Sequence, residues 1–169
     1  MCAESNLQYR QAQAEDIPGM ARLRALKRGT KEYWMDRITG YFEGEHNPQH
    51  ALAARVGFVA REDDEVVGLV VGHLTRRFGC DGELQWIFVD PKVRQRGIAS
   101  ELLRMLAKWF VEQNALNICV DVDPSNETAQ RFYARHGAVH LNQHWLVWSD
   151  IRVMLPKTDA GSESAQGPA

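Results

Sequence analysis

The segment Arg94-Gln95-Arg96-Gly97-Ile98-Ala99 combines cationic side chains with a glycine and a small residue. A glycine at a tight turn, followed by the first turn of a helix, lets several backbone N–H groups point at one position, where the helix dipole adds positive potential. Such a group of amides can bind a diphosphate. The side chains of Lys92, Arg94 and Arg96 suit the approach of a polyanionic ligand.

Two elements must hold this segment in place. Residues 84–89 are apolar, rich in β-branched and aromatic side chains, and closed by Asp90-Pro91, which predicts a buried strand. After Gly97, apolar residues recur every three or four positions, which predicts an amphipathic helix. Its apolar positions are Ile98, Leu102, Leu103, Leu106 and Phe110. The sequence therefore predicts a strand, a basic loop and a helix in direct succession.

The amino-terminal half predicts one short strand, two helices and a hairpin. Residues 7–11 form the strand, and Asp16 is the expected N-cap of a first helix that has Pro18 in its first turn and ends at Arg28-Gly29. The second helix covers residues 31–42, with an apolar stripe for packing against a sheet. Two alternating runs, residues 55–61 and 66–74, predict an antiparallel hairpin with a polar tip at residues 62–65.

The carboxy-terminal half predicts a second buried strand beside the first. Residues 117–123 read as this strand, and a helix runs from residues 124–126 to Gly137. Since a crossover helix joins them, residues 84–89 and 118–122 should be parallel neighbours. Residues 145–154 can supply one or two last strands. We expect a single domain over residues 1–156 and a disordered tail over residues 157–169, which lack large apolar side chains.

Composition excludes several classes of function. The chain has 169 residues and a formal net charge of −2, which gives no electrostatic argument for a nucleic-acid partner. The three cysteines, Cys2, Cys80 and Cys119, share no C-x-x-C spacing, which argues against a disulfide framework or a zinc site. His46 and His50 lack nearby acidic or thiol partners and read as solvated. Without an export signal or a membrane-spanning run, we expect a cytoplasmic protein, monomeric or homodimeric, with no metal and no membrane partner.

Two segments resemble motifs of a known family. V-D-P-x-x-R-x-x-G-I-A-x-x-L-L resembles the acyl-CoA pyrophosphate motif of the GNAT superfamily of N-acetyltransferases, and N-E-T-A-Q-R-F-Y-A-R-H-G resembles its second signature, N-x-x-A-x-x-F-Y-x-x-x-G. The resemblance covers about half of the chain, residues 55–138. It implies an α/β (α+β) fold: a mixed, mostly antiparallel sheet, a central parallel strand pair splayed for acyl-CoA, and helices on both faces. Gln95, Ala99 and Ala138 depart from the commonest pattern and weaken any subfamily assignment.

The resemblance also implies acetyl-CoA as the cosubstrate and a set of binding residues. The backbone of Phe88 and Val89 would pair with the pantetheine arm, Asn126 would bond near it, and Tyr133 would stabilise the leaving thiolate. Tyr133 could instead be a half-buried helical aromatic, but its spacing from Asn126 fits the family register. The expected cofactor-binding residues are Phe88, Val89, Arg94, Gln95, Arg96, Gly97, Ile98, Ala99, Ser100, Asn126 and Tyr133.

The acceptor side is less defined by sequence. The incoming amine must lose a proton, and Glu83 at the head of the central strand is the first candidate base, with His73 on the neighbouring strand or water as alternatives. Five acidic residues could favour a cationic acceptor or could be ordinary surface charge: Asp36, Glu43, Glu45, Asp81 and Glu83. Four aromatic residues could form an acceptor wall: Trp34, Tyr41, Trp145 and Trp148. For Trp34 and Tyr41, on the stripe of the second helix, packing in the core is the alternative.

These features predict an enzyme that moves an acetyl group from acetyl-CoA to a primary amine by direct attack in a ternary complex. An acyl-CoA-binding sensor with little catalysis is the alternative, because a cofactor site does not guarantee chemistry. A dinucleotide-binding domain is disfavoured, because G-x-G-x-x-G is absent and the glycine loop follows an antiparallel hairpin.

Overall fold

The computed structural model describes residues 6–157, so Cys2 and residues 158–169 of the expected tail lie outside the described part. Four short 3₁₀ helices accompany the main elements, at Ala14–Asp16, Arg77–Gly79, Pro91–Val93 and Ile151–Met154. The main elements are β1 (Leu7–Gln11), α1 (Ile17–Lys27), α2 (Lys31–Glu43), β2 (Ala51–Glu62), β3 (Glu65–Thr75), β4 (Gly82–Val89), α3 (Ile98–Glu112), β5 (Ile118–Asp121), α4 (Glu127–Arg135), β6 (Val139–His140) and β7 (Trp145–Trp148).

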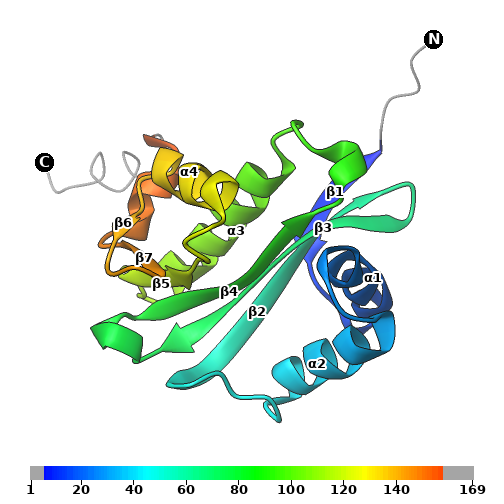
Figure 1. The fold of residues 1–169 in the computed structure, drawn as a ribbon, viewed down its shortest axis with the longest axis horizontal. Coiled ribbons are helices and arrows are strands. Elements are labelled where there is room, and N and C mark those ends of the chain that lie inside the picture. The colour runs from blue at the N-terminus through cyan, green and yellow to red at the C-terminus, as the bar shows by residue number, and fades with distance from the viewer. Residues whose placement is uncertain (1–5, 158–169) are drawn as a thin grey trace, which may run out of the picture.

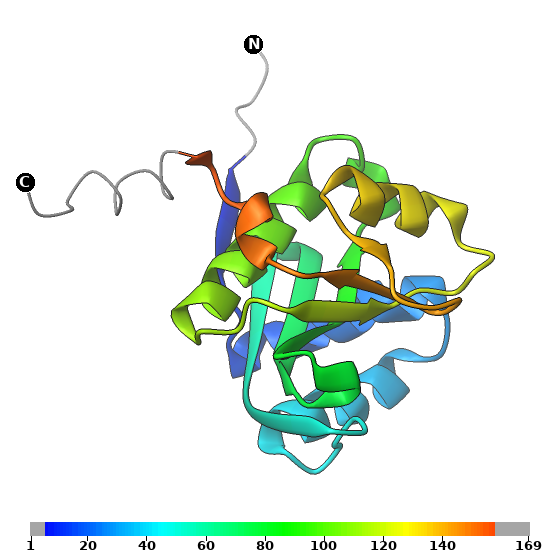
Figure 2. The same ribbon diagram turned by 90° about the vertical axis from the view of Figure 1, so that its left-hand side faces the viewer.

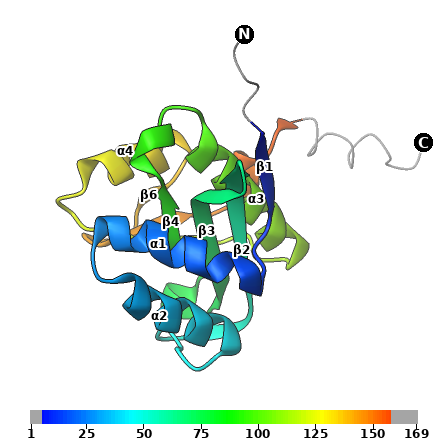
Figure 3. The ribbon, with the colours of Figure 1, turned by 90° about the vertical axis from the view of Figure 1, so that its right-hand side faces the viewer.

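A seven-stranded sheet, in the order β1-β2-β3-β4-β5-β7-β6, forms the middle of the molecule (Figure 1). Every neighbouring pair is antiparallel except β4 and β5, which are parallel. Helices α1 and α2 cover one face of the sheet, and α3 and α4 lie on the other (Figures 1 and 3). The predicted fold class and the parallel pairing of β4 with β5 are confirmed.

The two parallel strands separate after a short paired stretch. The pairs are Gly82 with Ile118, Glu83 with Cys119, and Leu84 with Val120. The register between β3 and β4 shifts at the same place, so that Gln85 is an extra residue in β4. Beyond this bulge, β5 continues beside β7 beneath α4 (Figure 2). Residues 85–89 of β4 therefore have no neighbouring strand on the β5 side within the described part of the chain.

Each face of the sheet buries its own core. The α3 face holds Leu102, Leu106 and Phe110, as the helical pattern predicts. A Cβ atom on Gly68 of β3 would lie 3.0 Å from side-chain atoms of Ile98 and Leu102, so glycine permits the close approach of α3. The opposite face buries the apolar stripe of α2, which confirms its prediction as core: Trp34, Ile38 and Tyr41.

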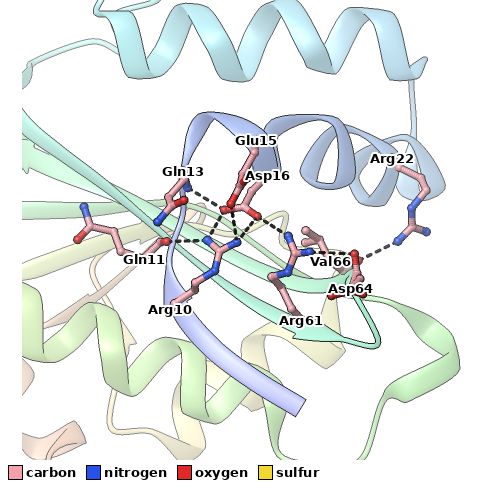
Figure 4. Close-up of polar contacts among 9 residues, drawn as sticks. All are labelled: Arg10, Gln11, Gln13, Glu15, Asp16, Arg22, Arg61, Asp64 and Val66. Carbon is pink, nitrogen blue, oxygen red and sulfur yellow. Dashed lines mark hydrogen bonds and ion pairs between the residues drawn. The ribbon is translucent and has the colours of Figure 1, made fainter. Parts of the chain in front are cut away.

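Asp16 is the N-cap residue of α1, as predicted, but its side chain has another role. Its fully buried carboxylate makes no side-chain cap to α1 and instead accepts from the Gln13 N–H at 2.8 Å. It also pairs with Arg10 at 2.6 Å and Arg61 at 2.7 Å (Figure 4). Burial alone raises the pKa of Asp16, but the hydrogen bonds from Arg10, Gln13 and Arg61 together outweigh it and hold the pKa below its ordinary value. Asp16 thus ties β1 and β2 to the start of α1.

Replacing Asp16 by Asn should destabilise the fold by about 3 kcal/mol at pH 7, because two guanidinium groups lose their buried partner. The lowered pKa means that the carboxylate stabilises the fold above about pH 4 and that this contribution fades as the pH falls through the folded-state pKa. Urea unfolding at pH 7 and pH 3 measures both effects. Glu15→Gln, at the exposed end of the same cluster, is the matched control and should change stability little. Equal stability of Asp16→Asn and the parent at pH 7 would contradict this account.

The end of the described chain differs from the expected strands. β7 is one of them, but Ile151–Met154 is a 3₁₀ helix, with the Asp150 side chain accepting from the Arg152 N–H at 3.0 Å. The edge strand β6 was not predicted, because its two residues are exposed and show no alternation. Over residues 6–157, no helix has the length and apolarity needed to span a bilayer.

Candidate active site

The loop before α3 holds its backbone amides in the arrangement that the sequence predicts. Gln95 (φ 65°) and Gly97 (φ 76°) both take left-handed backbone conformations, and no side chain caps α3. The first helical hydrogen bond runs from the Glu101 N–H to the Gly97 carbonyl at 3.0 Å. Among residues 6–157, no acceptor is found for the N–H groups of Gly97, Ile98, Ala99 and Ser100. Four amides and the positive end of α3 are thus available to an anion.

A cleft of about 710 Å³ opens in front of these amides. Its walls come from the end of β4, the loop and first turn of α3, helix α4, and the last residues of α1. Ten of the eleven expected cofactor-binding residues line it; Arg96 does not. The ten are Phe88, Val89, Arg94, Gln95, Gly97, Ile98, Ala99, Ser100, Asn126 and Tyr133. The separation of β4 from β5 is what leaves room for the cleft.

The cationic side chains of the cleft differ from those expected. Arg94 lines it, with its guanidinium 5.5 Å from the Phe88 ring centre and its Nε–H donating to the Val89 carbonyl at 3.3 Å. Arg96 instead pairs with Glu62 at 2.6 Å, so the prediction that its side chain stands beside the amides is corrected. Lys27 and Arg135 line the cleft and were not predicted. No local pattern marks Lys27, because only the packing of α1 against the sheet brings it to the cleft.

Tyr133 is a buried side chain at the wall of the cleft. It is 4% exposed. Its ring packs edge-on against Trp148 and Phe132, with ring centres 5.7 and 5.3 Å away. Among the described residues, no hydrogen-bond partner is found for its hydroxyl. Burial raises the pKa of Tyr133, and the positive charge of Arg24 lowers it by less. The group is therefore a neutral phenol at physiological pH, which can donate a hydrogen bond to an anion in the cleft.

Asn126 lies at the start of α4, as predicted, and has a structural role there. Its side-chain oxygen accepts from the Ala129 N–H at 3.1 Å and caps the helix. Asn126 also lines the cleft. With the oxygen engaged, its side-chain NH₂ is the group that can bond a ligand.

Glu83 belongs to a buried network apart from the lining of the cleft. Its carboxylate is 4% exposed and accepts from the Arg77 Nε–H at 3.1 Å, with the Nε2 atom of His73 at 3.4 Å. His73 is fully buried, and its Nδ1 lies 2.8 Å from the Tyr41 hydroxyl. The structure thus joins both sequence-predicted base candidates to each other, but neither lines the cleft with Tyr133.

The residues considered for an acceptor wall have mostly other roles. Trp34, Tyr41 and Trp148 are buried in the core. Trp145 is half-buried. Its ring centre lies 5.3 Å from that of Phe78 and 4.6 Å from the guanidinium carbon of Arg77. None of the five acidic residues lines the cleft. Asp81 accepts from the N–H groups of Leu116 and Asn117 at 3.2 and 3.1 Å, which is a structural role.

Solved structures with the same arrangement of elements define the class of fold. An N-acetyltransferase from Staphylococcus aureus Mu50 superposes with a TM-score of 0.64 at 20% identity, over 85% of this chain and 94% of that chain. An aminoglycoside N-acetyltransferase in complex with CoA gives a TM-score of 0.64 at 22% identity, over 81% of this chain and 90% of that chain. The fold is thus that of N-acetyltransferases.

Sequence comparison gives the family. The sequence model of the acetyltransferase (GNAT) family matches residues 21–138, and the chain belongs to this family. It is 28% identical over 86 residues to aminoglycoside N(6')-acetyltransferase type 1 of Salmonella typhimurium, covering 47% of this chain and 59% of that protein. It is 35% identical over 78 residues to L-2,4-diaminobutyric acid acetyltransferase of Marinococcus halophilus, covering 46% of this chain and 45% of that protein. The matches therefore span about half the length of these relatives.

Proposed function

We propose that this protein is an N-acetyltransferase that transfers an acetyl group from acetyl-CoA to a primary amine. The observation that carries the proposal is the set of unpaired amides of residues 97–100, which face a cleft opened by two separating parallel strands. A diphosphate fits this group of donors, because each N–H gains a charged acceptor that the protein itself does not supply. The relatives named for aminoglycosides and for diaminobutyric acid both point to an amine as the acceptor.

The unpaired end of β4 gives the pantetheine arm its position. Residues 85–89 lack a neighbouring strand on the β5 side, so their backbone groups on that edge are available for hydrogen bonds. Phe88 and Val89 lie there and line the cleft. An N–H group of this edge can also polarise the acetyl carbonyl as negative charge develops on its oxygen. Holding amine and thioester together in this way removes on the order of 7 to 11 kcal/mol from the barrier.

The phenol of Tyr133 is the group we assign to the leaving sulfur. When the amine attacks the thioester carbonyl, a carbon–nitrogen bond forms, the nitrogen loses a proton, the carbon–sulfur bond breaks, and the sulfur leaves as an anion. A neutral phenol in a poorly solvated wall stabilises this anion by donating a hydrogen bond to it. The side-chain NH₂ of Asn126, whose oxygen caps α4, is available to the pantetheine amides.

Glu83 is the group we assign to the proton of the amine, through water. Its carboxylate is kept in place by Arg77 at 3.1 Å and has His73 behind it at 3.4 Å. Since Glu83 does not line the cleft, water must connect it to the amine, and solvent can partly replace it. Glu83→Gln should therefore lower kcat/KM only about tenfold without changing acetyl-CoA affinity. His73→Gln is the comparison: a larger loss there than in Glu83→Gln would transfer the role of base to His73.

The test of the proposed function has two readouts on the same protein. Titration calorimetry with acetyl-CoA at moderate salt should show binding, and a thiol-release assay should show turnover with members of a panel of primary amines. Absence of binding would overturn the proposal altogether. Binding without turnover on any amine would replace the enzyme by an acyl-CoA-binding sensor.

A further inference from the structure

Arg24 is a partly buried cation on the inner side of α1, which crosses the sheet over β4 (Figure 3). Its guanidinium lies 4.4 Å from the ring centre of Trp34 and 5.8 Å from that of Trp86. Trp34 comes from α2, and Trp86 is the residue after the bulge in β4. Arg24 of α1 thus contacts one aromatic ring from α2 and one from β4, the strand whose end lines the cleft.

Arg24 lacks the anionic partner that comparable arginines have. Among residues 6–157, no hydrogen bond or ion pair is found for its side chain, and its buried Nε has no acceptor. On the same helix, Arg22 lies 3.8 Å from Asp90, and elsewhere Arg61 and Arg77 pair with buried carboxylates. Burial and the neighbouring Arg28 lower the pKa of Arg24 to about 10, so it remains charged at neutral pH. A partly buried cation without a partner loses some of its hydration, and an anionic ligand would offset that cost.

The position of Arg24 separates it from the diphosphate end of the cleft. Arg24 does not line the cleft itself, but Lys27, one turn further along α1, does. Arg94 belongs to the loop of the free amides. Arg24, in contrast, contacts Trp86, which lies three residues before Val89 in β4 and therefore away from that loop. A ligand anion at Arg24 would thus lie beside the middle of β4, away from the diphosphate end, which is where we place the acceptor.

We propose that Arg24 binds a carboxylate of the acceptor, so that the acceptor is a small amine that also carries a carboxylate, such as an amino acid. This inference rests on the proposed N-acetyltransferase function. The two terminal nitrogens of a guanidinium offer parallel N–H donors that match the two oxygens of a carboxylate. Stacking on Trp34 holds the plane of the guanidinium, which reduces the entropy lost on binding. Arg24 is then the residue that determines specificity for amines that carry a carboxylate over amines that lack one.

The experiment compares kcat/KM for α-, β- and γ-amino acids with kcat/KM for their carboxamides. The parent protein should prefer at least one acid over its amide by about tenfold, as expected for a charge-assisted bond. Arg24→Gln should reduce this acid-to-amide ratio to about one, and Arg24→Lys should keep part of it. Because acid and amide are measured on the same sample, partial unfolding cancels in the ratio. Comparing ratios between variants also cancels the difference in amine basicity. Arg28→Gln, which removes a neighbouring exposed charge, is the matched control and should leave the ratio unchanged.

Three outcomes would overturn the inference. An acid-to-amide ratio that is the same in Arg24→Gln as in the parent would remove Arg24 from acceptor recognition. A loss of acetyl-CoA affinity in Arg24→Gln, with an unchanged ratio, would assign Arg24 to the cofactor. Turnover with neutral amines alone would exclude a carboxylate on the acceptor. Failure of the proposed function is distinguishable, because then no amine of either kind is acetylated.

Discussion

Replacing Tyr133 by Phe should lower kcat for acetyl transfer by roughly 10²- to 10³-fold, the range found when one preorganised donor to a developing anion is removed. Affinity for acetyl-CoA should change less than about threefold, because the ring and its packing against Trp148 and Phe132 remain. The reason for the large effect is the burial of the phenol, which keeps water from replacing its hydrogen bond. Thiol release under saturating acetyl-CoA measures kcat, and calorimetry measures affinity.

The matched control for this prediction is Tyr33→Phe. Tyr33 lies on α2 and is 51% exposed, so its hydroxyl is not expected to affect turnover. If both Tyr133→Phe and Tyr33→Phe retain the kcat of the parent, the Tyr133 phenol has no part in the reaction. If both Tyr133→Phe and the parent bind acetyl-CoA but neither turns over, the protein is a binding module.

The unit from β4 to α3 could be predicted because all of its signals are local. The apolar run of β4, the Asp90-Pro91 turn, Gly97 and the amphipathic pattern of α3 are adjacent in sequence. The same holds for the Asn126 start and the Gly137 end of the α4 segment. These two units supply seventeen of the nineteen residues that line the cleft, and ten of these seventeen are among the predicted cofactor-binding residues. Local chemistry therefore specifies the cofactor side of the site.

The α1 side of the cleft could not be predicted, because it depends on contacts between distant segments. Lys27 lines the cleft, and Arg24 lies beside Trp86 of β4, only through the packing of α1 on β3 and β4. Asp16 shows the same limit: its position before a helix suggests a cap, but Arg10 and Arg61 from two strands draw the carboxylate elsewhere. The position of Glu83 at the head of β4 suggests a base, but its pairing with Arg77 depends on the folded arrangement of the chain. The residues that we propose for acceptor recognition are therefore brought together only by tertiary structure.

The largest loss of cofactor affinity should come from a negative charge placed among the free amides. Ala99 lies in the first turn of α3 and lines the cleft. The carboxylate in Ala99→Asp would accept hydrogen bonds from the unpaired N–H groups and would repel the diphosphate, so acetyl-CoA affinity should fall by more than about 100-fold. Acidic residues in a first helical turn are favourable, so the melting temperature should stay equal or rise. Binding and stability would therefore change in opposite directions.

Ala99→Asn separates the effect of charge from that of size. Asn has the same shape as Asp but no charge, so its hydrogen bonds to the amides are weaker, it does not repel the diphosphate, and it should reduce acetyl-CoA affinity far less than Ala99→Asp. Calorimetry at two salt concentrations measures both variants, and the difference between them should shrink as salt rises. Equal affinity of Ala99→Asp and the parent would mean that the diphosphate binds elsewhere. The proposed roles of Tyr133 and Arg24 depend on a diphosphate bound at this end of α3, so that result would also contradict them.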